Sequence, residues 1–316
     1  MHLLYYALST FNFQLSHLYI IPHTLQGGNK GIGKEIARRI GKEPNFTVLI
    51  ACRNLKLGQE SVRDLKSCND SNNDDDDKEC NVILLPIPLD LTNPISIKAA
   101  AEWVENEYNG VLDVLINNAA ICFNSPTLYN KVDYTTFEDQ ADITIDTNYF
   151  GTLNVIQSFL PLLEKSDSPR IINIASAAGR LSILKSQQLV DKFTSDTLTI
   201  PQLTQLMQDF VKNAKEGTHT SNGWPNTCYG VSKVGIIALT KILARQYYPQ
   251  MKINSVDPGY CKTDQNDNMG TVDPYRGAYT PYLLATSSSL DGSGEEDGDS
   301  GLHFYEERSI PWSYQF

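Results

Sequence analysis

The strongest constraint on the fold of this chain is a regular alternation between apolar, β-rich runs and amphipathic helical segments. The runs that read as buried parallel strands lie at 46–52, 82–89, 111–117, 170–176 and 252–256. The helical patterns lie at 33–42, 56–67, 94–108, 146–164 and 229–248. Strands separated by helices form right-handed βαβ units, so the sequence predicts an α/β fold built on one doubly wound parallel sheet.

Residues 181–222 interrupt this alternation because they are too long for a simple connection between a strand and a helix. Within them, "TIPQLTQLMQDFVKNAKEG" predicts a further helix. Thr199 can cap its start, Pro201 suits its first turn and Gly217 can end it. The residues expected to share its buried face are Leu203, Leu206 and Phe210.

The net charge of −11 is concentrated in two short acidic runs, 70–79 and 291–299, which each carry −5. We expect both runs to be solvated loops, because such a composition cannot bury a core. Neither run has the alternating acids of a calcium loop. No basic face stands out in the sequence, so nucleic acid is not an expected partner.

Cysteine usage and hydropathy bear on metals and location. The 6 cysteines are scattered without a CxxC pair, which argues against structural zinc and predicts free thiols in a reducing compartment. Residues 1–29 lack charged side chains but also lack the basic start and cleavage site of a signal peptide. No apolar run reaches the ~18 residues of a membrane span. We therefore predict a cytoplasmic protein with no metal and no membrane partner.

A glycine-rich stretch, "GGNKGIG" at 27–33, leads straight into a helical segment. Glycine lets the backbone approach a phosphate closely, and a helix N-terminus offers free N–H groups to it. Twenty residues beyond Gly33, Arg53 stands at the end of a strand, where an acid would bind the ribose hydroxyl of NAD. Alone, Arg53 would read as an exposed charge; together with Lys30 it suits a 2′-phosphate and favours NADPH/NADP.

Tyr229 and Lys233, in "YGVSK", are four residues apart and would project from one face of a helix. A tyrosine with a pKa of ~10 is a poor acid at neutral pH, but a neighbouring ammonium stabilises the phenolate and lowers that pKa. The pair thus predicts a proton donor, although a YxxxK string by itself is common.

Seven motifs in order resemble the short-chain dehydrogenase/reductase family. They are the glycine-rich stretch, "LDL" with Asp90, "NNAA" at 117–120, "TNYFGT" with Asn148, "INIAS" with Ser176, "YGVSK" and "PGYCKTD" at 258–264. Tyr229 follows Ser176 by 53 residues, because of the insertion, and this spacing is similar to that of the monomeric NADPH-dependent carbonyl reductases. The tail strings "TPYLLA" and "HFYEER" are similar to theirs too.

The resemblance implies a single Rossmann domain with a helical insertion before the catalytic Tyr helix, and an enzyme that reduces ketones, aldehydes or quinones with NADPH. Tyr229 would donate the proton to the carbonyl oxygen, which Ser176 would hold by a hydrogen bond. Lys233 would bind the nicotinamide ribose and lower the pKa of Tyr229. Asn148 would anchor a water chain that resupplies the proton.

The resemblance also implies cofactor and substrate contacts. Asp90 would bind the adenine and Asn117 would line the cofactor channel, while Ser176, Tyr229 and Tyr260 would contact the substrate. The full set of expected cofactor residues is Gly27, Asn29, Lys30, Gly31, Ile32, Gly33, Arg53, Asp90, Leu91, Asn117, Ala119, Tyr229, Lys233, Pro258, Gly259, Cys261 and Thr263. The inserted helix would cover the face through which most of the family pairs, so we predict a monomer.

The segment before the glycine-rich stretch departs from the family. Gln26 replaces a threonine, and Pro22 falls in what should be the central strand, where proline removes a ladder donor. Only Leu18 to Ile21 resemble a strand, and they lie far upstream. Either the first strand is weak, or residues 1–26 are not the natural start of the chain. We therefore separate an atypical segment, 1–26, from a reductase domain, 27–316.

Other functions remain open at this point. A catalytically impaired cofactor-binding or interaction protein of the same fold would follow from a damaged first strand. An NAD-dependent alcohol oxidase is disfavoured by Lys30 and Arg53. Cys228 and Cys261, near the expected site, read either as incidental packing or as oxidant-sensitive thiols.

Overall fold

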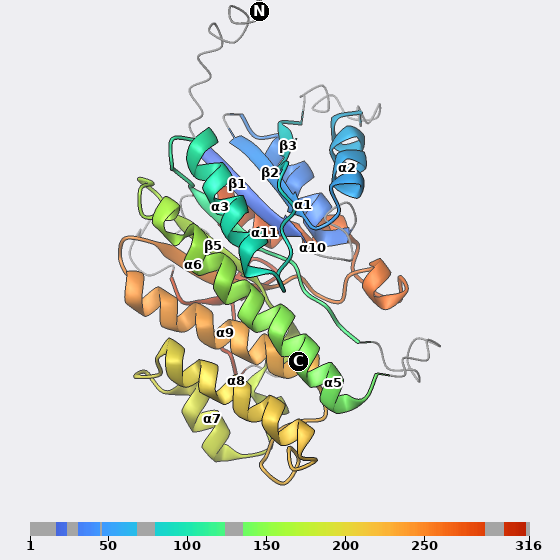
Figure 1. The fold of residues 1–316 in the computed structure, drawn as a ribbon, viewed down its shortest axis with the longest axis vertical. Helices are drawn as coiled ribbons and strands as arrows, with labels where there is room; N and C mark the ends of the chain where they lie inside the picture. Colours follow the sequence, from blue (N-terminus) through green and yellow to red (C-terminus); the bar gives the residue numbers. More distant parts are fainter. Residues whose placement is uncertain are drawn as a thin grey trace, which may run out of the picture.

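The computed structural model describes residues 17–23, 31–44, 46–67, 80–123, 135–287 and 300–313. In these residues, eight strands form one sheet in the order β3-β2-β1-β4-β5-β6-β7-β8 (Figure 1). Every neighbouring pair is parallel except β7 and β8. The strands are β1 His17–His23, β2 Phe46–Cys52, β3 Val82–Leu84, β4 Val114–Asn117, β5 Arg170–Ile174, β6 Lys252–Asp257, β7 His303–Tyr305 and β8 Arg308–Ser309.

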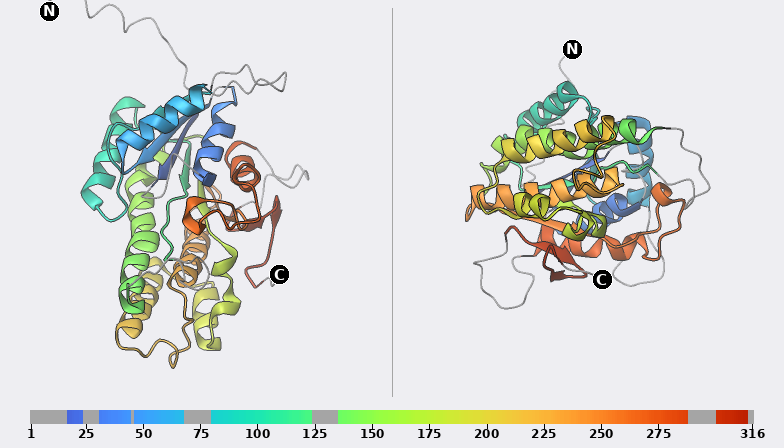
Figure 2. Two further views of the ribbon diagram at one scale, coloured as in Figure 1. Left: turned by 90° about the vertical axis from the view of Figure 1, so that its right-hand side faces the viewer. Right: turned by 90° about the horizontal axis from the view of Figure 1, so that it is seen from below.

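Helices cover both faces of the sheet, as the two turned views show (Figure 2). On one face lie α3 (Pro94–Glu107), α6 (Thr152–Leu163) and α9 (Cys228–Tyr247), and these enclose the larger apolar core. The other face is covered by helices of a second, smaller core: α1 (Gly31–Gly41), α10 (Pro274–Gly277) and α11 (Tyr279–Thr286), with α2 (Leu55–Ser67) near the β3 edge. The predicted doubly wound sheet is therefore confirmed.

The first strand is present and central, although its sequence departs from the family. β1 pairs with β2 along its whole length, from His17 to His23. Its described pairing with β4 covers Tyr19 and Ile20, upstream of Pro22, whose missing N–H therefore removes no bond from that ladder segment. The strand is longer at both ends than the expected Leu18 to Ile21. Residues 24–30, which include Gln26, lie outside the described residues, as do both acidic runs.

Three predicted strands are shorter than expected. The run 82–89 is a strand only over Val82–Leu84, because Pro86 and Pro88 have no N–H to give to a ladder. The runs 111–117 and 170–176 shorten to Val114–Asn117 and Arg170–Ile174. In contrast, 46–52 matches β2 residue for residue.

The helix predicted at 146–164 is the second part of a longer helical rod. The rod begins as α5 (Phe137–Ile145), which Thr136 caps through its side-chain oxygen. A π-helical turn, η1 (Asp146–Gly151), follows, and α6 continues the rod to Leu163. Such turns occur frequently at functional sites, and η1 carries Asn148.

The insertion holds two helices, α7 (Gln187–Thr194) and α8 (Ile200–Lys215). The predicted helix is confirmed as α8: Thr199 and Gln202 form a reciprocal capping box at its start, and Leu203, Leu206 and Phe210 are buried. Both helices extend below the sheet in Figure 1, where α8 packs on α5 and α9. Among the helices of the described residues, none is long and apolar enough to span a membrane.

Candidate active site

A cavity of about 450 Å³ opens at the carboxyl ends of β4, β5 and β6, where ligands bind in open α/β sheets. Segments distant in sequence converge on it: the start of α1, the turns after β4, β5 and β6, and the first two turns of α9. Its lining includes the predicted residues Gly31, Ile32, Gly33, Ala119, Ser176, Tyr229, Lys233, Pro258, Gly259, Tyr260, Cys261 and Thr263. The fold thus assembles most of the described candidates in one place.

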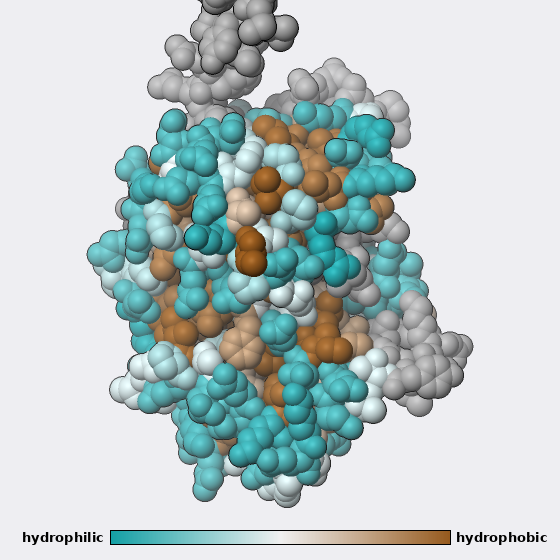
Figure 3. Space-filling view, viewed as in Figure 1, coloured by the Kyte–Doolittle hydropathy of each residue, from teal (hydrophilic) through white to brown (hydrophobic). Residues whose placement is uncertain are grey.

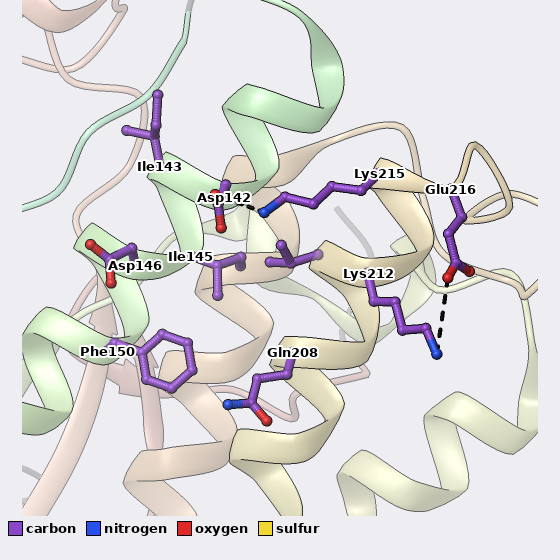
Figure 4. Close-up of a pocket in the computed structure, with 10 residues that line it drawn as sticks. Asp142, Ile143, Ile145, Asp146, Phe150, Gln208, Lys212, Lys215 and Glu216 are labelled. Atoms are coloured by element: carbon purple, nitrogen blue, oxygen red, sulfur yellow. Dashed lines mark hydrogen bonds and ion pairs between the residues drawn. The ribbon is translucent and has the colours of Figure 1, made fainter.

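A larger pocket, of about 800 Å³, lies elsewhere, between α5, η1 and α8 (Figure 4). Its rim carries the Lys215–Asp142 ion pair, and Phe150 and Ile145 line its apolar part. It contains none of the residues predicted for the site. Although this pocket is larger, the described residues that line it include no set of reactive groups that converge on one point, so we place the chemistry in the smaller cavity.

Tyr229 and Lys233 lie in the first two turns of α9 and face the cavity from one side of that helix. Thr227 caps α9 by accepting a hydrogen bond from the Gly230 N–H, which fixes where the helix begins. The Lys233 Nζ lies 5.5 Å from the centroid of the Tyr229 ring and donates to the Ile174 carbonyl at 2.7 Å. The predicted pairing on one helix face is confirmed.

The protonation of this pair differs from our expectation. Burial raises the pKa of Tyr229 above its ordinary value, with smaller contributions from Cys122 and Asp257. Burial also lowers the pKa of Lys233 to about 8. Loss of solvation therefore dominates the net shift of the Tyr229 pKa, and the lowering of that pKa by Lys233 stays a prediction. A phenol that keeps its proton at neutral pH is still suited to donate it.

Ser176 lies two residues beyond the end of β5 and directly before a short 3-10 turn, η2 (Ala177–Gly179). Its hydroxyl oxygen accepts a hydrogen bond from the Ala178 N–H at 3.2 Å. The same side chain forms a hydrogen bond with Tyr229, so the fold closes the 53-residue separation between them. One hydroxyl and one phenol therefore meet at a single point of the cavity, where a carbonyl oxygen could accept from both.

Asn148 is buried in η1 and holds the turn after β4. Its Nδ2 group donates to the Ile121 carbonyl at 2.9 Å and to the Ser232 hydroxyl at 3.0 Å. Its Oδ1 accepts from the Ile121 N–H at 2.8 Å. Both side-chain N–H donors are thus engaged by protein atoms, and Asn148 joins α9 to the cavity wall. The water chain that the resemblance implies stays a prediction.

The N-terminus of α1 meets the turn after β6 at the cavity. Gly31 has φ +66°, and a Cβ there would come within 3.0 Å of the Thr263 Cγ2. Glycine is therefore required both by the backbone conformation and by the closeness of Thr263. The first turn of α1 contains no acid. Gly27, Asn29 and Lys30 lie outside the described residues.

The residues predicted to bind adenosine lie beside the sheet edge rather than in the cavity lining. The Arg53 guanidinium is 3.8 Å from the Asp90 carboxylate, and both side chains are partly exposed. Leu91 is buried against Gly151, where a Cβ would come within 2.7 Å of it. Arg53 and Asp90 are thus placed together, next to the strand ends.

Asn117 does not line the cavity as expected. Its Nδ2 donates to the Asn173 Oδ1 on the neighbouring strand at 2.8 Å, and the side chain is buried within the sheet. The cavity wall is formed instead by Asn118, Ala119 and Ala120. Asn117 is the last residue of β4, and successive side chains along a strand point to opposite sides. The cavity is therefore lined by the next residue, Asn118, while Asn117 bonds to the neighbouring strand.

Sequence reasoning missed several residues of the cavity: Cys122, Arg180, Asp257 and Gln265. Of these four, only Asp257 could have been found from the sequence, because it directly precedes the "PGY" string.

The two cysteines named earlier are buried, and burial raises the pKa of Cys228 and of Cys261 to about 12. Cys122 lines the cavity, and burial raises its pKa to about 11. All three thiols are thus disfavoured as thiolates.

These groups fit a phosphorylated dinucleotide. The first turn of α1 contains no acid, so its N–H groups suit a pyrophosphate. Arg53 offers a planar cation near the strand ends. The cavity extends from the start of α1 to the Ser176 hydroxyl and the Tyr229 phenol. A doubly wound sheet with this arrangement defines the class of dinucleotide-dependent oxidoreductases.

Comparison with known proteins agrees with this class. A family model described as short chain dehydrogenase matches residues 24–187, and one described as Enoyl-(Acyl carrier protein) reductase matches residues 216–281. The chain belongs to the short-chain dehydrogenase family.

Named relatives cover nearly the whole chain. Carbonyl reductase [NADPH] 1 of Mus musculus is 35% identical over 90% of this chain and 96% of its own length. The (+)-neomenthol dehydrogenase of Capsicum annuum is 34% identical over 88% of this chain and 93% of its own. The solved structure of salutaridine reductase from Papaver somniferum is 28% identical and superposes with a TM-score of 0.75, covering 91% of this chain and 99% of that one.

Proposed function

We propose that this chain is an NADPH-dependent carbonyl reductase, with Tyr229 as the proton donor. The observation that carries the proposal is the meeting of Ser176, Tyr229 and Lys233 in one cavity beside the N-terminus of α1. The substrates we propose are small ketones, aldehydes and quinones. The names of the relatives, among them carbonyl reductases [NADPH] and a neomenthol dehydrogenase, support this range.

When bound, NADPH would supply the hydride that adds to the carbonyl carbon. In our proposal, the Ser176 hydroxyl donates a hydrogen bond to the carbonyl oxygen and so fixes the substrate's orientation. The Tyr229 phenol gives its proton to the same oxygen as negative charge develops there. Because burial keeps the pKa of Tyr229 high, the phenol is protonated over the physiological pH range and ready for this step.

Lys233 supports the proton transfer from Tyr229 without contacting the carbonyl group in our proposal. Its Nζ donates to the Ile174 carbonyl, which leaves two further N–H donors for a ribose hydroxyl and for the phenol oxygen. An ammonium group there stabilises the phenolate left after the proton is given up, until solvent returns a proton. Arg53 and the α1 N-terminus would hold the phosphates, and Asp90 the adenine.

The proposal is tested by following the loss of NADPH absorbance with a quinone or an aromatic ketone as acceptor. We expect turnover in the parent chain and a loss of about 10²- to 10⁴-fold in Tyr229→Phe. NADPH binding, measured by calorimetry, should persist in that variant. The control is Tyr248→Phe, an exposed tyrosine just beyond α9.

The outcomes separate the three candidate functions. Cofactor binding without turnover in the parent chain would favour the impaired cofactor-binding protein. A preference for NAD and for alcohol oxidation would favour an NAD-dependent alcohol oxidase and contradict the role of Arg53. Equal turnover in Tyr229→Phe and the parent would remove Tyr229 from the chemistry.

We propose further that the protein is a monomer. α8 packs its buried face, which includes Met207 and Phe210, on α5 and α9. The Phe210 ring meets Phe137 of α5 edge to face, with centroids 6.3 Å apart. The outward surface of α7 and α8 is largely hydrophilic (Figure 3). Sedimentation at micromolar concentration should give one chain per particle, and a dimer would contradict the proposal.

A further inference from the structure

Asp257 is a buried carboxylate at the cavity that the proposed mechanism does not use. It is the last residue of β6 and only 4% exposed. It lies one position beyond the last pair of the β5–β6 ladder, Ile174↔Val256, so it stands beside the turn that carries Ser176. On its other side it pairs in register with Tyr305 of β7. A carboxylate is rarely buried in this way without a partner.

The carboxylate is held by donors from two separate loops. The Gly259 N–H donates to its Oδ1 at 2.9 Å, which closes the turn after β6. The Ala177 N–H, in the turn directly after Ser176, also donates to it. Burial raises the pKa of Asp257, whereas the two backbone donors and the nearby cations oppose that shift and favour the ionised form. Asp257 therefore joins the loop that bears Ser176 to the Pro258–Gly259 turn.

Its charge acts on the reactive pair. The cations that face it are Arg180, from the loop after β5, and Lys233 of α9. The groups that feel its negative charge are Tyr229, Lys233, Cys261 and Tyr305. Cys122, from the turn after β4, faces both Tyr229 and Lys233. Asp257 is thus the carboxylate that acts on both members of the pair.

We propose that Asp257 is a positioning residue for the reduction: its carboxylate fixes the Ser176 loop against the Pro258–Gly259 turn and keeps the proton on the Tyr229–Lys233 pair. This inference rests on the proposed function for its effect on turnover. The negative charge disfavours a phenolate at Tyr229 and favours an ammonium at Lys233. Both effects oppose loss of the first proton from the pair, so their signs agree. Reduction in our proposal uses a protonated phenol beside a charged ammonium group, and Asp257 extends the pH range over which the pair holds both protons.

The test replaces the charge by neutral groups that can still accept a hydrogen bond, in Asp257→Asn and Asp257→Ser. The first readout uses the cofactor-free protein: an NMR titration of ¹³C-labelled lysine, with the Lys233 signal assigned from Lys233→Met. Starting from a pKa of about 8, we expect the Lys233 titration to fall by about one pH unit in both variants. The control is Asp191→Asn, which removes an exposed carboxylate from α7.

The second readout is the pH profile of NADPH oxidation with a quinone. The alkaline limb should move to lower pH in both neutral variants and stay in place in Asp191→Asn. Arg180→Gln separates charge from loop structure: it disturbs the same loop but keeps the carboxylate, so the Lys233 titration should not fall.

Three results would overturn the inference: an unchanged or raised Lys233 titration in folded neutral variants, an equal fall in Arg180→Gln, or failure of both neutral variants to fold. The last would show that Asp257 serves the stability of β6 and its neighbouring turns instead. Should the parent chain lack turnover with every carbonyl compound tried, the proposed function fails, whereas the NMR titration still decides the role of the charge.

Discussion

The backbone of Gly179 lies directly against the backbone of Lys233. A Cβ on Gly179 would come within 2.7 Å of the Lys233 carbonyl carbon and 2.8 Å of its Cβ. On the other side, the Gly179 carbonyl accepts a hydrogen bond from the Trp312 indole at 2.8 Å. The turn after Ser176 is therefore fixed between the catalytic helix and the C-terminal segment. This contact sets how far Ser176 stands from Tyr229.

Gly179→Ala should separate these elements. The added methyl group meets backbone atoms, which cannot move as a side chain would, so we expect a loss of about 1–3 kcal/mol in the free energy of unfolding. The separation of Ser176 from Tyr229 should also lower kcat. Urea unfolding and steady-state kinetics measure both. Gly217→Ala is the control: its φ of +66° strains an alanine, but nothing lies within 4 Å. It should cost some stability and leave kcat unchanged.

Arg53→Ala should weaken NADPH far more than NADH. The guanidinium lies at the end of β2, near Asp90, and we assign it to the 2′-phosphate that NADH lacks. Loss of one charged hydrogen bond is worth about 1.5–3 kcal/mol, so the KM for NADPH should rise about 10- to 100-fold. The matched control is Arg63→Ala, an exposed arginine on the neighbouring helix α2. An equal rise in KM for both nucleotides would show that Arg53 does not read the phosphate.

Asn266 organises the turn that closes one side of the cavity. Its Oδ1 accepts from the Thr263 N–H at 3.2 Å, and its Nδ2 donates to the Cys261 carbonyl at 2.9 Å. Asn266→Ala leaves both backbone groups without this partner, so we expect a loss of about 1–3 kcal/mol in stability and a higher KM for the carbonyl compound. Asn266→Asp keeps the acceptor and loses the donor, and its effect on KM should be intermediate. A change confined to kcat would contradict this role.

The fold followed from the sequence wherever local signals and burial agreed. α8 was predictable because Thr199, Pro201 and the Leu203–Leu206–Phe210 face all gave the same answer. α5 was not, because Phe137–Ile145 has a weak apolar face and joins α6 through a π-helical turn that periodicity does not detect. β7 and β8 hold three and two residues, and so short a strand is defined by its neighbours in the sheet.

The site was predictable where a motif fixed a residue's chemistry, and not where burial decides its charge. The positions of Ser176, Tyr229 and Lys233 agree with the motifs. The net upward shift of the Tyr229 pKa could not be predicted, because desolvation depends on packing that no short string encodes. Asn117 was harder for a related reason: it is the last residue of β4 and bonds to Asn173, whereas the next residue, Asn118, lines the cavity, and the sequence does not say which of the two does so.

His303 should make the stability of the protein depend on pH. It lies in β7, is 6% exposed and contacts the Ser255 hydroxyl through Nδ1 at 3.0 Å. Burial, with the nearby Lys241 charge, lowers its pKa from 6.5 to about 4. Above pH 6.5 neither the folded nor the unfolded chain protonates it, and it contributes nothing to the pH dependence. Between pH 6.5 and 4 the unfolded chain takes up the proton first, so stability falls as pH falls.

The full effect of His303 corresponds to about 3 kcal/mol, reached near pH 4. Urea unfolding of the parent chain and of His303→Gln at several values between pH 8 and pH 4.5 would measure it. Glutamine retains an acceptor for Ser255 but cannot take up a proton, so its stability should fall less steeply with acid than that of the parent. The two curves should run parallel above pH 7 and converge below it. Parallel curves over the whole range would mean that His303 takes up its proton in the folded state as easily as in the unfolded chain.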